Sequence, residues 1–212
     1  MPKNRVSEAL AVWSFSMLSL LLSSLIEVKG YAYSTIVTGS LLAAPPIAYM
    51  IIRREVLESM LQKIKNLQLY YTLSMALGAW VLSGGLTFIQ DIVYPPPPWY
   101  LEEIRRLAPS NFNELIIALL LTWLIVAPVE ELLFRWIVLR ALVEAVGIRV
   151  GVIVSALIFS FSHLDPWNFI SPLIVGLAAG WIIAKGGSLL SAIIIHGLHN
   201  TMVHIINMFL LS

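Results

Sequence analysis

The sequence predicts an all-α fold, a polytopic bundle of transmembrane helices. The chain has 212 residues, of which 59% are hydrophobic and only 12% charged, whereas soluble domains carry about 25% charged residues. Its mean hydropathy is +0.88, and it contains seven tryptophans and seven tyrosines. Apolar runs of this kind form helices in a bilayer because a helix satisfies its backbone hydrogen bonds internally.

The composition also excludes several kinds of function. The formal net charge of +1 gives no basis for binding nucleic acid. The chain has no cysteine, so it has no disulfide, no thiolate metal site and no cysteine nucleophile. The expected partners are therefore the lipid bilayer and a membrane-associated protein or peptide, and the sequence does not indicate an oligomeric state.

We expect about seven membrane spans, within a range of six to eight. The first is interpreted as a retained helix, although Lys3 and Arg5 before an apolar run resemble a signal peptide. Pro45 and Pro46 are expected to kink or break the second span, and Pro128 to kink the fourth, which is one long helix or two. The expected spans cover residues 9–26, 31–52, 66–90, 114–146, 150–164, 166–184 and 188–212.

Two connecting segments have recognisable patterns. Residues 53–65 alternate charged and apolar positions, which predicts an interfacial amphipathic helix. Residues 91–113 are interpreted as a loop containing four successive prolines, with Trp99 and Tyr100 as an interface anchor. There is no internal repeat and no low-complexity linker, so residues 1–212 are expected to form a single integral membrane domain.

The distribution of Lys and Arg predicts the orientation. With a cytosolic N-terminus, the positive-inside rule is obeyed by nine of these residues and violated by three. The nine on the cytosolic side are Lys3, Arg5, Arg53, Arg54, Lys63, Lys65, Arg140, Arg149 and Lys185, and the three outside are Lys29, Arg105 and Arg106.

Glu130 and Glu131 are adjacent carboxylates inside an expected span. The uncharged run before them, residues 115–129, is shorter than the roughly 20 apolar residues needed to cross a bilayer. The span must therefore include the carboxylates, and a charged side chain near the bilayer centre costs on the order of 3 kcal/mol. This cost indicates a buried polar site.

Polar residues on three spans are expected at a similar depth. With a rise of about 1.5 Å per residue from the nearest cytosolic Arg or Lys, Glu130 lies roughly 15 Å deep and His163 roughly 21 Å deep. On the last span, His196 and Asn200 lie roughly 12 to 18 Å deep by the same count. We therefore expect a carboxylate, two imidazoles and an amide to meet within the membrane.

The spacing of these residues separates their roles. Glu131 and Arg135 are four residues apart and are expected to pair on one helix face. Glu130 is turned by about 100° from Glu131, which leaves its carboxylate available for chemistry. His196 and Asn200 are also four residues apart, so both side chains project in one direction.

Such a site suits amide hydrolysis. Glu130, assisted by His163, can take a proton from water, while His196 and Asn200 hold this water or stabilise the oxyanion. Alternatively, Glu130, His163 and His196 are the candidate ligands of a zinc ion, since their types are ordinary zinc ligands. The HExxH pattern of soluble metalloproteases is absent. No cofactor is required by the sequence, and zinc is the candidate if there is one.

Three motifs resemble the CPBP family of intramembrane proteases, also called the CAAX-protease and bacteriocin-processing (Abi) family, which includes the Ras-converting CAAX endopeptidases. The motifs are Glu130-Glu131-x-x-x-Arg135, Phe159-x-x-x-His163 and His196-x-x-x-Asn200, in this order on successive apolar segments. They lie within residues 128–200, and the catalytic part is expected at about 114–212. The segment before residue 113 carries no matching motif.

The resemblance implies a glutamate-dependent endopeptidase, described in that family as metal-dependent or metal-free. It implies that Glu130 is the base, that His163, His196 and Asn200 surround the water, and that Glu131, Arg135 and Phe159 support them. The substrate would be a membrane-associated, prenylated or other, protein or peptide cut near its C-terminus. The short chain favours a prokaryotic cell membrane, with the active site opening towards the cytosol.

A second hypothesis is a non-enzymatic membrane protein that uses the same polar cluster as an ion or proton path, or as a scaffold in bacteriocin immunity. Ionisable residues within membranes mark transport routes as well as active sites. Each motif also has a structural interpretation. These are an ion pair of the adjacent glutamates with Arg135, an interfacial histidine at 163 that caps the segment before Asp165 and Pro166, and inter-helix hydrogen bonds for His196 and Asn200. The ordered set of three motifs favours the enzyme, and the lack of an inverted repeat disfavours a transporter.

Overall fold

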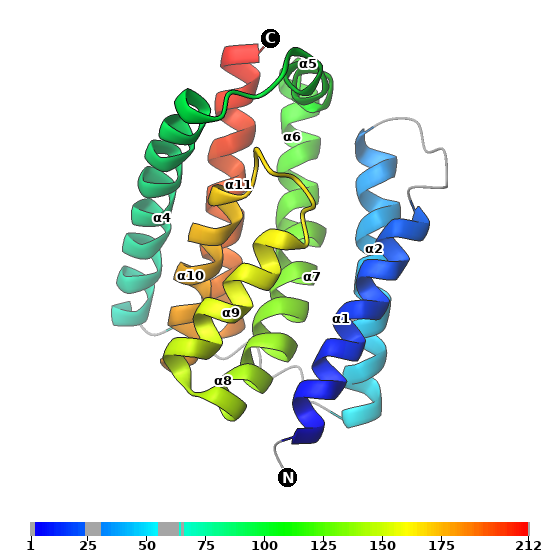
Figure 1. Cartoon of the computed structure of the whole chain (residues 1–212). Helices are drawn as coiled ribbons and strands as arrows, with labels where there is room; N and C mark the ends of the chain where they lie inside the picture. The colour runs from blue at the N-terminus through cyan, green and yellow to red at the C-terminus, as the bar shows by residue number, and fades with distance from the viewer. Residues whose placement is uncertain (1–2, 24–30, 55–63, 65, 212) are drawn as a thin grey trace.

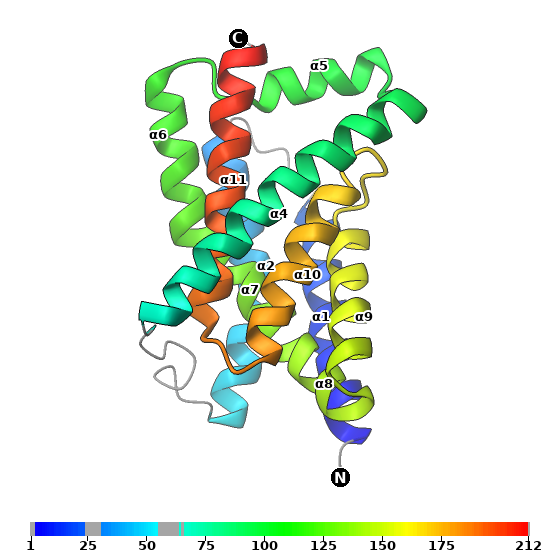
Figure 2. The ribbon, with the colours of Figure 1, turned by 90° about the vertical axis from the view of Figure 1, so that its left-hand side faces the viewer.

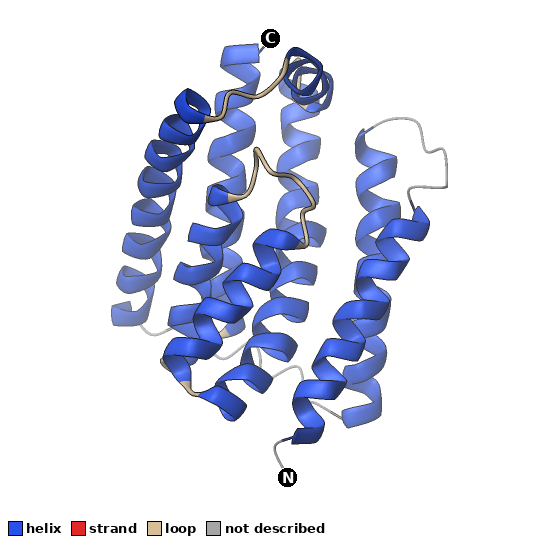
Figure 3. Cartoon of the chain, viewed as in Figure 1, coloured by secondary structure: helices blue, strands red, loops and turns tan. Residues whose placement is uncertain are grey.

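The structure is a computed structural model that describes residues 3–23, 31–54, 64 and 66–211 (Figure 1). Every regular element in these ranges is a helix (Figure 3), as the all-α prediction requires. The predicted amphipathic helix at 53–65 lies almost entirely outside the described residues. The single-domain prediction remains a prediction.

Helices α1 (Lys3–Ser23) and α2 (Tyr31–Arg53) form an antiparallel pair at one side of the bundle (Figure 1). Arg53 and Tyr49 of α2 both donate to the carboxylate of Glu8 in α1. Pro45 and Pro46 lie inside α2, which continues to Arg53. The expected alternative of a broken second span is therefore wrong, because transmembrane helices accommodate proline when neighbouring groups compensate for the lost hydrogen bonds.

Helix α4 (Asn66–Val93) crosses the bundle obliquely and leads to α5 (Pro98–Leu107), which lies across one end (Figure 2). The prediction of a loop throughout 91–113 is wrong for α5. The last of the four prolines, Pro98, occupies the first helical position, where its missing N–H would have no partner in any case. No residue of α5 is buried, which is typical of an amphipathic helix at the membrane surface.

One continuous helical segment of 35 residues, Phe112–Val146, carries the acidic pair. It consists of α6 (Phe112–Leu121), a π-helical stretch (Thr122–Val126), α7 (Ala127–Glu131), a second π-helical stretch (Leu132–Leu139) and α8 (Arg140–Val146). Pro128 follows the first π-helical stretch, as expected where proline removes a hydrogen bond of the α-helical pattern. The predicted fourth span is thus one helix with locally widened turns.

Three further helices complete the bundle: α9 (Ile148–Phe161), α10 (Ile170–Ala184) and α11 (Leu189–Leu211). Gly147 and Gly186 make the turns before α9 and after α10, with φ of 83° and 88°, a region in which glycine has no steric penalty. Helix α10 packs closely on α9, and a Cβ on Gly176 would lie 3.1 Å from the Cα of Ala156.

Five helical segments are long and apolar enough to cross a membrane: 5–23, 32–53, 67–93, 112–146 and 189–210. The shorter α9 and α10 are also apolar. These seven segments correspond to the seven expected spans, although α9 and α10 are too short to cross alone at full bilayer thickness. The chain has the features of an integral membrane protein.

The tight turn between α8 and α9 leads to the first prediction. A Cβ on Gly151 would lie 2.8 Å from the backbone nitrogen of Val143, so Gly151→Ala should force the two helices apart. We expect a loss of about 1–3 kcal/mol in the free energy of unfolding, measured by thermal unfolding in detergent.

The matched control is Gly85→Ala in α4, where an added Cβ meets nothing within 4 Å. This variant should be neutral or more stable by up to about 1 kcal/mol, because alanine favours the helix. Equal unfolding temperatures for the two variants would contradict the described α8–α9 packing.

Candidate functional site

The predicted site residues surround one cavity of about 270 Å³ between the long helix, the α9–α10 loop, α10 and α11. All four predicted catalytic residues line it, together with Phe159. They are Glu130, His163, His196 and Asn200. Three segments that are far apart in the sequence therefore bring a carboxylate, two imidazoles and an amide to one space.

Glu131 and Arg135 form the predicted ion pair, with Nε of Arg135 3.0 Å from Oε2 of Glu131. The two side chains are 0% and 1% exposed, so both charges are withdrawn from solvent. The Arg135 guanidinium also lies over the ring of Phe159, at 4.1 Å from its centroid, a cation–π contact that partly replaces lost solvation. Phe159 in turn meets the rings of His163 and His196 edge to face.

Glu131 has a second partner that the sequence did not predict. Its Oε1 lies 2.8 Å from Nδ1 of His196. A carboxylate accepts, so Nδ1 carries the proton in a neutral imidazole and Nε2 has a lone pair. The amide Nδ2 of Asn200 lies 3.1 Å from this Nε2 and donates to it. Glu131 thus fixes the orientation and tautomer of His196.

Glu130 is placed differently from its neighbour. Its Oε2 lies 4.0 Å from Nε2 of His196, and its side chain is 19% exposed. This oxygen is buried without a hydrogen-bond partner, although buried polar atoms are normally satisfied. The separation is too long for a direct hydrogen bond, and a water molecule beside Glu130 could donate to this oxygen.

His163 lies at the edge of the cavity, just after the end of α9, and is exposed. Its Nδ1 is 2.9 Å from the carbonyl oxygen of Phe159. Because a carbonyl only accepts, Nδ1 is the donor and Nε2 again carries a lone pair. Glu130 and His163 therefore both offer acceptor atoms for the protons of a bound water, whereas Nε2 of His196 already accepts from Asn200.

The α9–α10 loop that follows His163 is anchored from the surface helix. Asp165 accepts from the backbone N–H groups of Trp167 and Asn168, at 3.0 and 3.1 Å. The hydroxyl of Tyr100 in α5 donates to the same carboxylate at 2.7 Å. Burial, and secondarily this carboxylate, raises the pKa of Tyr100, so Tyr100 remains a donor at neutral pH. Asp165 thus acts as a loop cap.

Two further histidines of α11 line the cavity, His199 and His204. Nε2 of His199 lies 2.8 Å from the hydroxyl of Ser171, and Nε2 of His204 lies 3.1 Å from that of Thr122. His199 follows His196 by three residues, and His204 follows Asn200 by four. This spacing in the sequence indicates that they share a helix face with the motif.

The zinc alternative can be compared with the positions of its candidate ligands. Within the described residues, no group of three His, Cys, Asp or Glu side chains lies close enough to hold one metal ion. Glu130, His163 and His196 therefore do not form a ready ligand set in this arrangement. No step proposed below passes through a metal.

The exposed part of the cavity lining, which we call the cavity mouth, includes His163 and Asn168. Both lie in the α9–α10 loop, which contacts α5 through Tyr100. This loop, α5 and the C-terminus lie towards the same end of the bundle (Figure 1). The cytosolic N-terminus and the active site opening towards the cytosol, both expected from the sequence, stay predictions.

These features define a class: a helical membrane protein with a carboxylate–imidazole cavity between its spans. The family model described as type II CAAX prenyl endopeptidase Rce1-like matches residues 112–202, which include every residue of the three motifs. Over these residues the chain is similar to the Rce1-like type II CAAX prenyl endopeptidases. This similarity indicates an intramembrane protease that acts on protein or peptide substrates. No curated protein and no solved structure matches the chain.

The buried ion pair leads to a stability prediction. Glu131→Gln leaves the Arg135 charge buried without its partner, and Arg135→Met leaves Glu131 with His196 alone. Each single variant should lose about 3–5 kcal/mol of stability, measured by thermal unfolding in detergent. The double variant should lose clearly less than the sum, because the two residues act as a pair. Additive losses would show that the pair is not coupled.

Proposed function

We propose that this chain is an intramembrane endopeptidase that hydrolyses a peptide bond near the C-terminus of a membrane-associated protein or peptide. One observation carries the proposal most directly. Oε2 of Glu130 is buried, has no hydrogen-bond partner and faces Nε2 of His196 across 4.0 Å. A water molecule held there would lie beside a carboxylate able to take its proton.

The proposed reaction begins with that water. Glu130, assisted by Nε2 of His163, accepts a proton as the water oxygen attacks the carbonyl carbon of the scissile bond. The carbonyl oxygen becomes an oxyanion, and the second N–H of the Asn200 amide donates to it. Glu130 then returns the proton to the amide nitrogen, the oxyanion re-forms the carbonyl and the C–N bond breaks. The products are a carboxylic acid and an amine, and transfer of the acid's proton to the amine gives a carboxylate and an ammonium group.

Glu131 has a positioning role in this proposal. Its hydrogen bond of 2.8 Å holds His196 with Nε2 towards the cavity, and Arg135 pairs with the other oxygen of the Glu131 carboxylate. A similar role is played by the buried aspartate of serine-protease triads, which orients its histidine and stabilises the imidazolium.

The apolar surroundings favour a substrate that is itself in the membrane. Leu115, Ala118 and Ala127 are buried on the helix that carries Glu130, and the lipid-facing sides of the bundle are apolar. The matching family is described as CAAX prenyl endopeptidases, so prenylated proteins are the substrate class to be tested first.

Glu130→Gln should abolish cleavage of a farnesylated peptide ending in a CAAX sequence. Loss of a general base costs about 10²- to 10⁴-fold in rate, and the amide is nearly the same size as the carboxylate. The measurement is peptide release by mass spectrometry, with thermal unfolding to show that the fold is kept.

Glu144→Gln is the matched control, because Glu144 lies on the same long helix but is exposed and paired with Arg5. It should retain normal activity. Full activity of Glu130→Gln would refute the base assignment, and inactivity of the wild-type chain on all membrane substrates would favour the non-enzymatic hypothesis.

We also propose that the N-terminus is cytosolic, since the charge bias supports it, so the cavity mouth faces the opposite side of the membrane. The chain has no cysteine, and single substitutions therefore give clean labelling sites. In intact cells a membrane-impermeant maleimide should label Glu102→Cys in α5 but not Arg5→Cys in α1. The reverse pattern would place the mouth in the cytosol and make cytosolic proteins the substrate pool.

A further inference from the structure

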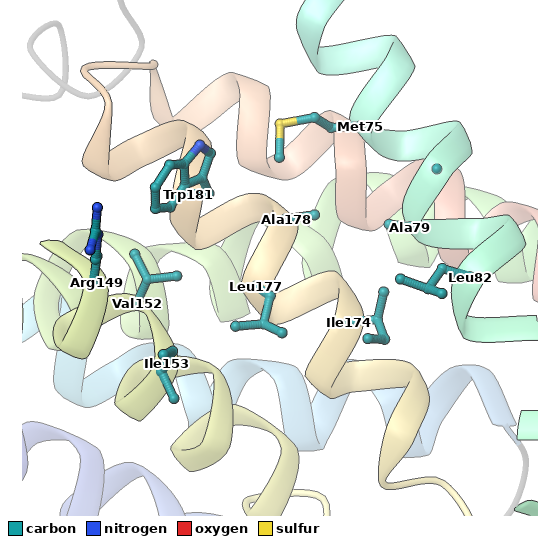
Figure 4. A pocket seen from close by; sticks show the side chains of 11 residues that line it. Met75, Ala79, Leu82, Arg149, Val152, Ile153, Ile174, Leu177, Ala178 and Trp181 are labelled. Carbon is teal, nitrogen blue, oxygen red and sulfur yellow. The ribbon is translucent and has the colours of Figure 1, made fainter. Parts of the chain in front are cut away.

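A second cavity of about 590 Å³ lies on the outside of the bundle between α4, α9 and α10 (Figure 4). Its lining is apolar except for one residue, Arg149. Helix α4 contributes Met75, Gly78 and Leu82, and the facing helices contribute side chains such as Ile153 and Trp181. We call this cavity the α4–α9–α10 groove. It shares no lining residue with the candidate active site.

The groove faces the lipid. Leu82, Ile153 and Trp181 are 52%, 52% and 40% exposed, and all three line it. In a bilayer such a surface is in contact with hydrocarbon chains, because the bilayer core contains no water. The groove is therefore shaped and placed to hold a hydrocarbon chain lying along the helices.

Two cations lie at one end of this groove. Arg149 lines it near the start of α9, and Lys185 follows the end of α10, with its ammonium 5.0 Å from the ring centroid of Trp181. Both cations are exposed, and neither makes an ion pair with a carboxylate in the described part of the chain. This end is the one at which the positive-inside rule places the cytosolic surface.

The pattern of one apolar groove that ends in two cations matches the chemistry of an anionic phospholipid. An acyl chain would bury apolar surface along α4, α9 and α10, and the headgroup phosphate would meet the Arg149 guanidinium, which binds phosphate with two parallel hydrogen bonds. A zwitterionic lipid would bring an additional cation towards Arg149 and Lys185. Charge complementarity therefore favours a net negative headgroup.

We propose that the α4–α9–α10 groove is a binding site for an anionic phospholipid of the cytosolic leaflet, with its phosphate held by Arg149 and Lys185. The site is separate from the proposed active site and does not depend on the proposed function. Because α9 and α10 flank the loop that carries His163, a lipid bound in the groove would also contact the helices on either side of that loop.

The test uses the full chain in detergent and native mass spectrometry with phosphatidylglycerol and phosphatidylcholine. The wild-type chain should retain phosphatidylglycerol preferentially. Arg149→Gln and Lys185→Gln should each weaken its binding about fivefold, the effect of one basic residue near an anionic surface. Arg105→Gln in α5 is the charge-matched control and should leave binding unchanged.

A second pair of variants tests the groove itself. Gly78 lines it, and an added Cβ there meets nothing within 4 Å, so Gly78→Leu should fill the groove without disturbing the helix and reduce lipid retention. Gly85→Leu makes the same change on α4 away from the groove and should not. Equal retention of both lipids, or equal effects of Arg149→Gln and Arg105→Gln, would overturn the proposal. So would unchanged retention in Gly78→Leu.

Discussion

The site depends on the two interactions of the Glu131 carboxylate. One oxygen pairs with Arg135 and the other accepts from His196, so a single buried anion joins the long helix to α11. An unpaired charge at this depth would be expensive, and the compensation comes from two partners and from the ring of Phe159 beneath the guanidinium. The same bonds that make the charge tolerable also fix the imidazole facing the cavity. Stability and chemistry are therefore tied to one residue.

Adjacent residues of a helix differ by about 100° in direction, which places the two neighbouring carboxylates in different surroundings. Glu130 and Glu131 end the short α7, with π-helical turns on both sides. Such turns are frequent at functional sites. Pro128 contributes to the first of them by lacking an N–H. Glu131 is 0% exposed, while Glu130 is 19% exposed beside the cavity.

Much of the fold could be predicted from the sequence because it follows from hydropathy and local spacing. The seven apolar segments and the Glu131–Arg135 pair depend only on residues close in the chain, as does the shared face of His196 and Asn200. The Glu131–His196 bond could not be predicted, because it depends on how two helices 65 residues apart are rotated against each other. Helix α5 was not predicted, because four successive prolines indicate a loop, although the last of them, Pro98, begins the helix. The direction of the cavity mouth was also beyond sequence reasoning, since it depends on where the α9–α10 loop lies between its neighbours.

The opposite ends of the bundle have different chemistry, and this difference links the two proposed sites. Arg53, Arg140, Arg149 and Lys185 lie at the end of the N-terminus, whereas at the other end the two carboxylates of α5 are balanced by Arg105 and Arg106. In the proposed lipid site, phosphate contacts would hold the basic end at an anionic leaflet. Helices α9 and α10 span both regions, because they line the α4–α9–α10 groove and also carry or flank the loop with His163. Lipid contacts at the basic end therefore act on the same two helices that shape the entrance to the candidate active site.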